Sequence, residues 1–266
     1  MIDQHRSPGQ SGGAVRIATE CSLALADGFL GALPVATSFE KLRLLLPDVA
    51  TAMEFRYFAV LGHDDPAPDK RGRIDLRDYP AAVADLIIGK RLDRRDPVIR
   101  GCAFAGSAFV WSDLHRIIRL GSRDKKRLEF GAREGLTDGI TVPCWSRATC
   151  LGSCTFAGPK RSGDFDRYLG AIQLIGVFGF QHARRLARGG DPPPGPLPRL
   201  NPRVRDCVVL AGRGLSNKEI ARALALTPRT VDGYLTEARR LFNVRDRTEL
   251  VIAAISAGEI SLHELQ

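Results

Sequence analysis

The hydrophobic pattern divides the chain into a mixed α and β part and a helical part. In the first part, apolar residues three and four apart predict helices, and alternation of apolar and polar residues predicts strands. The expected helices are residues 38–46, 79–89, 124–134 and 164–186, and the expected strands are residues 54–61, 109–111, 139–143 and 149–157. Residues 63–78 are polar and are read as a loop. Strands bracketed by helices predict an α/β/α sandwich with an antiparallel sheet.

The second part contains four short helices whose starts are marked by capping residues. Asn201 with the following proline begins the first helix, and Ser216 and Glu219 fit a capping box for the second. Thr227 with its following proline begins the third helix, and Asp246 begins the fourth. Two helices joined by a short turn make a helix-turn-helix. The fold class is therefore α+β, with an all-α four-helix domain at the C-terminus.

A proline- and glycine-rich stretch, RRLARGGDPPPGPLP, separates the two parts. The sequence predicts four segments: a flexible tail over residues 1–30, a larger domain over 31–183, a linker over 184–198 and the helical domain over 199–266.

Composition adds little to this division. The chain has 44% hydrophobic and 26% charged residues, which is typical of a globular protein. Its net charge of +9 favours polyanionic partners only weakly, because the excess is spread along the chain. No run approaches the roughly 18–20 apolar residues of a membrane span, and the N-terminus lacks the apolar core of a signal peptide. We expect a cytoplasmic protein with no membrane partner.

The cysteines give no metal signature. The six cysteines show no zinc-ligand spacing, so we expect reduced core residues and no metal or cofactor. Cys150 and Cys154 are four apart on an expected strand, which predicts that they share a face. A redox or cofactor-dependent sensor built on these two thiols is the alternative.

The helix that begins at Thr227 is the candidate recognition helix. In a helix-turn-helix the outer face of this helix enters the major groove and contacts base edges. Its candidate reading residues are Thr227, Arg229, Thr230, Asp232, Gly233 and Thr236. The candidate phosphate contacts are Lys218, Arg222, Arg239, Arg240 and Arg245. Pattern alone leaves open a small helical docking module with solvated charges.

Residues 210–251, which contain SNKEIA followed by RTV and a final RTEL, closely resemble the LuxR-type helix-turn-helix. This resemblance implies that double-stranded DNA is a partner. Three positions of this chain are notable when it is compared with the family's sequence pattern. Val204 stands where the family usually has Glu, and Tyr234 replaces its usual His. Asp232 on the reading face repels phosphate and could accept from cytosine N4.

The larger domain resembles the autoinducer-binding domain of quorum-sensing LuxR regulators over roughly residues 35–185. The motifs that carry the resemblance are Tyr79-Pro80, Asp96-Pro97-Val98, residues 109–113 and residues 135–143, in the family's order and spacing. A phosphoacceptor receiver domain, the other common partner of this helix-turn-helix, needs an acidic pair after an early strand. Residues 1–60 contain no such pair.

The resemblance implies a buried pocket for an acylated homoserine lactone. Asp96 would accept from the ligand amide N–H, and the Tyr79 hydroxyl would donate to the acyl carbonyl with support from Thr155. Trp111 would wall the pocket, and Gly139 would shape the backbone beside it. Without the family spacing, Asp96 reads as a helix cap or turn residue and Trp111 reads as plain core.

Two pocket positions depart from the family pattern. Val83 stands where the family has a Trp whose indole N–H donates to the lactone carbonyl, and Ile87 replaces a Tyr. An unpaired buried carbonyl costs about 1–3 kcal/mol, or roughly tenfold to over a hundredfold in affinity. We therefore expect an ordinary acyl-homoserine lactone to bind weakly or not at all. The retained Asp96 and Tyr79 favour another ligand with an amide or a similar donor–acceptor pair.

These observations predict a transcription regulator that acts as a homodimer and is modulated by a small molecule. The last helix, with Leu250, Ile252 and Ile255, is either a dimer surface or core. The alternative function is a ligand-independent regulator, or an anti-activator that heterodimerises with a related protein. An enzyme is not expected, because the chain has no nucleophile motif and no glycine-rich phosphate loop, and its five histidines are scattered.

Overall fold

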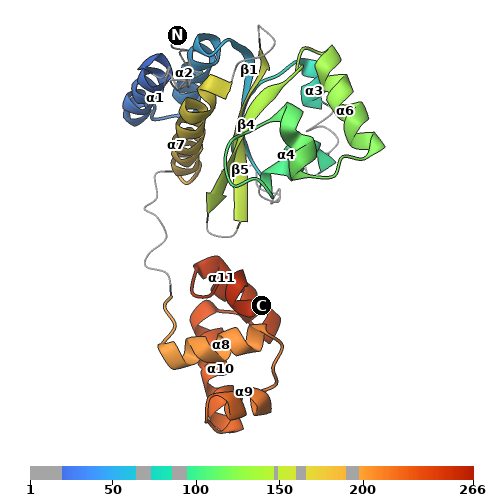
Figure 1. The fold of residues 1–266 in the computed structure, drawn as a ribbon. Helices are drawn as coiled ribbons and strands as arrows, with labels where there is room; N and C mark the ends of the chain where they lie inside the picture. Colours follow the sequence, from blue (N-terminus) through green and yellow to red (C-terminus); the bar gives the residue numbers. More distant parts are fainter. Residues whose placement is uncertain (1–19, 64–72, 86–94, 147–148, 160–165, 190–197) are drawn as a thin grey trace, which may run out of the picture.

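The computed structural model describes residues 20–63, 73–85, 95–146, 149–159, 166–189 and 198–266 (Figure 1). Its N-terminal domain is built on one five-stranded antiparallel sheet in the order β2-β1-β5-β4-β3. The strands are β1 (Phe55–Gly62), β2 (Asp75–Asp78), β3 (Phe109–Val110), β4 (Gly139–Ser146) and β5 (Thr149–Pro159).

Helices cover both faces of this sheet (Figure 1). One layer consists of α1 (Glu20–Ala32), α2 (Phe39–Ala52) and α7 (Leu169–Ala187). The other layer holds the shorter helices α3 (Ala81–Ala84), α4 (Pro97–Cys102), α5 (Leu114–Ile117) and α6 (Ser122–Arg133). The predicted α/β/α sandwich is confirmed.

The main core lies between the sheet and the first helical layer. Alternate residues of the strands, such as Phe58, Val142 and Phe156, are almost fully buried there against α1, α2 and α7. Helix α7 approaches β4 so closely that a Cβ on Gly176 would lie 2.7 Å from the Val142 side chain. The opposite face of the sheet is therefore the one left for a polar site.

Most predicted elements of this domain are present. Ser38 caps α2 by accepting from the Lys41 N–H, and this helix continues beyond its expected end, through Pro47 to Ala52. The strands predicted at 54–61, 109–111, 139–143 and 149–157 correspond to β1, β3, β4 and β5. The helix predicted over residues 79–89 is the short α3, and residues 86–89 lie outside the described residues.

Three expectations need correction. The tail predicted over residues 1–30 contains α1, whose Ala26 and Phe29 are buried in the main core. The predicted linker starts too early, because α7 continues to Ala187. The loop predicted over residues 63–78 contains β2, which pairs with β1.

The C-terminal domain contains the four predicted α-helices. These are α8 (Pro202–Gly212), α9 (Asn217–Ala223), α10 (Pro228–Phe242) and α11 (Arg247–Ala257). The capping box at α9 is confirmed, with the Ser216 N–H donating to Glu219 at 2.8 Å. Thr227 and Asp246 also accept from backbone N–H groups at the starts of their helices, whereas the Asn201 side chain makes no such bond.

A separate hydrophobic core holds these four helices together. It includes Val204, Ile220, Val231 and Leu250, all almost fully buried. Val204, where the family usually has Glu, is therefore a core residue of α8. Among the described residues of the whole chain, no helix is long and apolar enough to cross a membrane.

Candidate functional site

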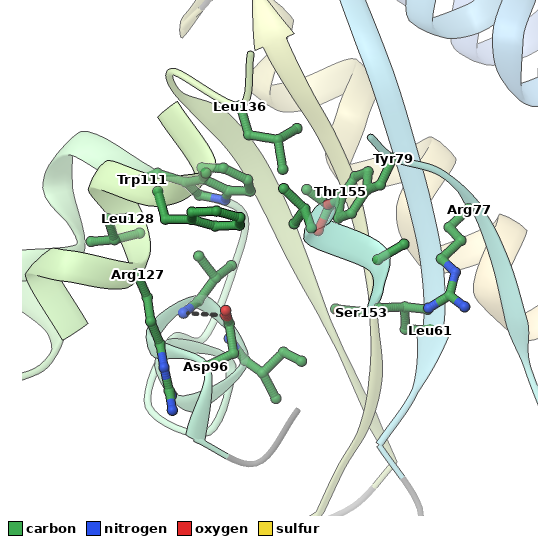
Figure 2. Close-up of a pocket in the computed structure, with 16 residues that line it drawn as sticks. Leu61, Arg77, Tyr79, Asp96, Trp111, Arg127, Leu128, Leu136, Ser153 and Thr155 are labelled. Atoms are coloured by element: carbon green, nitrogen blue, oxygen red, sulfur yellow. Dashed lines mark hydrogen bonds between the residues drawn. The ribbon is translucent and has the colours of Figure 1, made fainter. Parts of the chain in front are cut away.

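A pocket opens on the face of the sheet opposite the main core (Figure 2). Its lining brings together five of the predicted ligand-site residues, namely Tyr79, Val83, Asp96, Trp111 and Thr155. The remaining walls are mainly apolar, with Leu61, Val98, Ile99, Leu128, Phe130 and Leu136. A few polar groups on an apolar lining are typical of small-molecule sites. Ile87, also predicted for this site, lies outside the described residues.

The hydroxyl groups of Thr141, Thr155 and Tyr79 form a row, of which Thr155 and Tyr79 belong to the pocket lining. The Trp111 indole Nε1–H donates to Thr141 Oγ1 at 2.8 Å, and the Thr141 and Thr155 hydroxyls are 2.9 Å apart. Thr155 in turn hydrogen-bonds the Tyr79 side chain. Burial and the nearby Asp96 raise the pKa of Tyr79, so its hydroxyl keeps its proton and remains a donor.

Asp96 has two roles in the geometry. Its Oδ1 accepts from the Val98 N–H at 2.9 Å and the Ile99 N–H at 3.2 Å, which caps α4. The same carboxylate also lines the pocket, on the opposite wall from Tyr79 (Figure 2). Burial raises the pKa of Asp96, and the two backbone hydrogen bonds counteract this effect only in part. The cap expected from the residues alone is present, and it fixes where the carboxylate points.

Gly139 lies behind the pocket wall and is not part of its lining. A Cβ there would be 2.9 Å from the Phe156 carbonyl oxygen and 3.0 Å from Trp111 Cε2. The neighbouring Asp138 accepts from the Gly139 N–H at 2.8 Å and the Ser112 N–H at 3.2 Å. Gly139 therefore lets Trp111 pack directly on β4, and Asp138 ties the start of β4 to the segment that carries Trp111.

Sequence reasoning missed two arginines of the pocket. Arg77 comes from β2, and Arg127 comes from α6 on the other side, beside Asp96 (Figure 2). Ser153 of β5 also lines the pocket and shares a 3.0 Å hydrogen bond with His63 Nε2. Arg77 precedes Tyr79 by two residues, so reading residues 75–78 as a strand would have placed both side chains on one face.

The two cysteines expected to share a face do not. A β-bulge between β4 and β5 leaves Leu151 without a partner on β4, because Cys144 pairs with Gly152 and Trp145 pairs with Cys150. The extra residue reverses the alternation of side chains. Cys154 consequently lies in the main core, whereas Cys150 packs beside Cys102 on the other face.

Cys150 has an unusual environment of its own. A hydrogen bond from the Cys102 thiol and the proximity of His63, with Nδ1 at 3.9 Å, lower the pKa of Cys150 to about 5. The thiolate form of Cys150 is therefore favoured relative to that of an ordinary thiol.

The candidate nucleic-acid interface is the outer face of α10. Helical spacing places Arg229, Asp232, Gly233, Thr236 and Arg240 on the face opposite the buried Val231, Leu235 and Ala238. Thr227 and Thr230 are held together at the start of the helix, with their hydroxyls 2.8 Å apart. The predicted phosphate contacts Lys218, Arg222, Arg240 and Arg245 are exposed, and Arg239 is partly buried with a 2.8 Å bond to Thr236.

Two further residues organise this surface and were not predicted. Asn217 at the start of α9 donates to Asp232 at 3.5 Å and accepts from Arg247 at 3.3 Å. Arg247 also donates to the Leu215 carbonyl. This chain of contacts connects α9, α10 and α11 and orients the Asp232 carboxylate.

The last helix is mixed in character. Leu250 is fully buried in the core, and Ile255 packs partly against it. Ile252 is 58% exposed, and Leu241 on α10 is also exposed. Of the three apolar residues considered for a dimer surface, Ile252 is the exposed one.

Both domains match known protein families. Residues 38–183 match the autoinducer binding domain, and residues 199–254 match the family described as bacterial regulatory proteins, luxR family.

The relatives agree with this assignment. The transcriptional activator protein BjaR1 of Bradyrhizobium diazoefficiens is 29% identical over 79% of this chain and 88% of its own length. The quorum sensing-dependent regulator RpaR of Rhodopseudomonas palustris is also 29% identical, over 69% of this chain and 74% of its own. The crystal structure of Escherichia coli SdiA has the same fold, with a TM-score of 0.55 and 21% identity over 90% of this chain and 98% of its own. The chain therefore belongs to the LuxR family of bacterial transcription regulators, with an autoinducer-binding domain followed by a LuxR-type DNA-binding helix-turn-helix.

Proposed function

We propose that the N-terminal pocket binds a small acylated amide and that this binding controls DNA recognition by the helix-turn-helix domain. The observation that carries the proposal is the convergence of Tyr79, Asp96 and Thr155 on one largely apolar pocket. A tyrosine hydroxyl that keeps its proton donates to a carbonyl, and an opposing carboxylate accepts from an N–H. Together they fit the two polar groups of an amide.

The lining of the pocket favours only weak binding of an ordinary acyl-homoserine lactone. Val83 is almost fully buried at the position where the family places an indole donor. The Trp111 indole N–H donates to Thr141 and is not free to take over that role. A lactone carbonyl in this pocket would lose a hydrogen bond, and the ligand is therefore an amide with a different head group.

Asp96→Asn is the variant that tests the ligand site. The side-chain oxygen of the new asparagine keeps an acceptor for the α4 cap, while its NH₂ group presents a donor to the ligand N–H. Loss of a hydrogen bond to a charged group costs about 1.5–3 kcal/mol, so affinity should fall by roughly tenfold to over a hundredfold. The measurement is a thermal-shift titration of full-length protein from a host that makes no lactones, with a panel of acyl-homoserine lactones and aryl amides.

The pH dependence of the ligand-free protein provides the control. Because the pKa of Asp96 is raised in the folded protein, the folded state holds this proton more tightly, and the contribution of Asp96 to stability decreases as the pH rises above about 4. An asparagine side chain does not titrate, so the Asp96→Asn variant should gain in melting temperature relative to the wild type between pH 4 and pH 7. Asp96→Ala, which also removes the cap, should be less stable than Asp96→Asn at both pH values. Ligand stabilisation of Asp96→Asn equal to that of the wild type, or no response of the wild type to any panel member, would contradict the proposed site.

The DNA-binding unit is a homodimer in this proposal. A single short recognition helix contacts too few base pairs for useful specificity, and two copies would read two half-sites. The exposed Ile252 and Leu241 are apolar groups available to an interface. Sedimentation velocity with and without ligand measures the association directly, and a monomer on specific DNA would exclude it.

An anti-activator is the second candidate function. The observation in its favour is Asp232, an exposed carboxylate on the reading face, which weakens attraction to phosphate. A gel shift with palindromic duplexes selected from a random pool separates the two candidates. Specific retention supports the DNA-binding regulator, and no retention together with capture of a related regulator supports the anti-activator.

A further inference from the structure

Strand β2 places two charged side chains with unsatisfied atoms on the pocket side of the sheet. Arg77 Nε and Asp75 Oδ1 form an ion pair at 3.4 Å, with about a quarter of each side chain exposed. Arg77 Nη1 and Asp75 Oδ1 are nevertheless shielded from solvent and have no hydrogen-bond partner. Within the described ranges they are the only buried side-chain nitrogen or oxygen atoms without a partner.

Buried polar atoms without a hydrogen-bond partner, such as these two, are rare in folded proteins. A buried donor without an acceptor is unfavourable, and an arginine cannot relieve it by losing its proton. Arg77 itself lines the ligand pocket. The missing acceptor can therefore come from a bound molecule.

The sheet register defines where this donor lies relative to the amide site. Ala59 on β1 pairs with Arg77 on one side and with Thr155 on the other. Arg77 and Thr155 are thus two strands apart, or about 10 Å at the usual strand spacing. Ala59, which lies between them, has only a methyl side chain. Leu61, two residues further along β1, lines the pocket. Arg77 and Asp96 lie on different sides of the pocket (Figure 2).

We propose that the ligand carries a hydroxyl group at the end of its chain remote from the amide, which accepts from Arg77 Nη1 and donates to Asp75 Oδ1. This inference rests on the proposed function. A methyl end would leave both buried atoms without a hydrogen-bond partner. A carboxylate end would meet Arg77 but would also be repelled by Asp75, which already shares that guanidinium. A hydroxyl is the small group that satisfies one donor and one acceptor together.

The test uses three matched series of N-acyl aryl amides, from hexanoyl to decanoyl, with chains that end in methyl, hydroxyl or carboxylate. Thermal-shift and calorimetric titrations of the full-length protein compare the series at equal chain length. At the chain length that reaches Arg77, the hydroxyl series should bind at least about tenfold more tightly than the methyl series, the change expected for one hydrogen bond to a charged group.

Two variants test whether Arg77 is responsible for the preference for the hydroxyl series. Arg77→Met keeps an unbranched apolar side chain without the guanidinium, and it should abolish or reverse the preference for the hydroxyl series. Arg127→Met is the matched control, because it removes the guanidinium beside Asp96 and should change all three series alike. If Arg77→Met alone fails to fold because Asp75 is left unpaired, the double variant Asp75→Asn/Arg77→Met removes both charges and should show the same loss.

The possible failures are distinguishable. Equal binding of the methyl and hydroxyl series by the wild type overturns the inference and leaves the proposed function intact. Tightest binding of the carboxylate series also overturns it, because Arg77 would then act as an anion site. No binding of any series counts against both this inference and the proposed function.

Discussion

Val83→Trp is expected to raise the affinity for N-acyl homoserine lactones by about tenfold to over a hundredfold, the range for restoring one partner to a buried carbonyl. Val83 packs with Leu136 and Ala157 at the wall of the pocket, next to the partly buried Trp111. An indole at this position would extend into the pocket and present an N–H that the existing lining does not offer there. The measurement is a calorimetric titration with octanoyl-homoserine lactone before and after the substitution.

Val83→Phe is the control for this gain. It adds most of the aromatic volume but no donor, so any improvement common to both variants comes from packing. Both substitutions enlarge a buried side chain and are expected to lower the stability of the ligand-free protein by about 1–3 kcal/mol. Equal affinity gains for Trp and Phe would show that the missing donor is not what limits lactone binding.

Arg229→Ala is expected to weaken binding to a selected operator by about 1–3 kcal/mol and to relax specificity at one base position. Arg229 is exposed in the first turn of α10, the part of a recognition helix that reaches base edges. Lys218→Ala, on α9, should instead weaken all duplexes alike and reduce the salt slope of binding by about one. Fluorescence anisotropy with the operator and a scrambled duplex, over a range of salt, measures both effects.

Arg229→Lys separates charge from base reading. Lysine keeps the positive charge but lacks the planar fork that binds guanine in two places. It should therefore retain the binding to scrambled DNA while losing the preference for the operator. A variant that keeps full operator preference would show that Arg229 contacts phosphate and not a base.

The agreement between sequence and structure is best in the helix-turn-helix domain. Its helices begin at Ser216, Thr227 and Asp246, whose side chains accept from backbone N–H groups only three residues away. Such caps are local, so the sequence reports them without knowledge of the fold. The recognition face of α10 follows equally from local spacing, because one helix face is buried and the other is not.

Only the pocket residues that belong to family motifs could be predicted from the sequence. Tyr79, Asp96, Trp111 and Thr155 come from separate parts of the chain, and only the family spacing related them before the fold was known. Strand β2 was missed because four residues with charges at three positions give no hydrophobic alternation. Its strand character comes from pairing with β1, which is a long-range contact.

The sequence by itself determined the two-part organisation, the order of most helices and strands and the candidate recognition helix, because these depend on contacts between residues near in the chain. Tertiary structure alone decided which face of the sheet several strand side chains take. The bulge at Leu151 sends Cys150 and Cys154 to opposite faces, and the pairing of β2 with β1 places Arg77 in the pocket. Side chains alternate with a period of two along a strand, so one unpaired residue or one strand pairing reverses a face, and no local pattern encodes that choice.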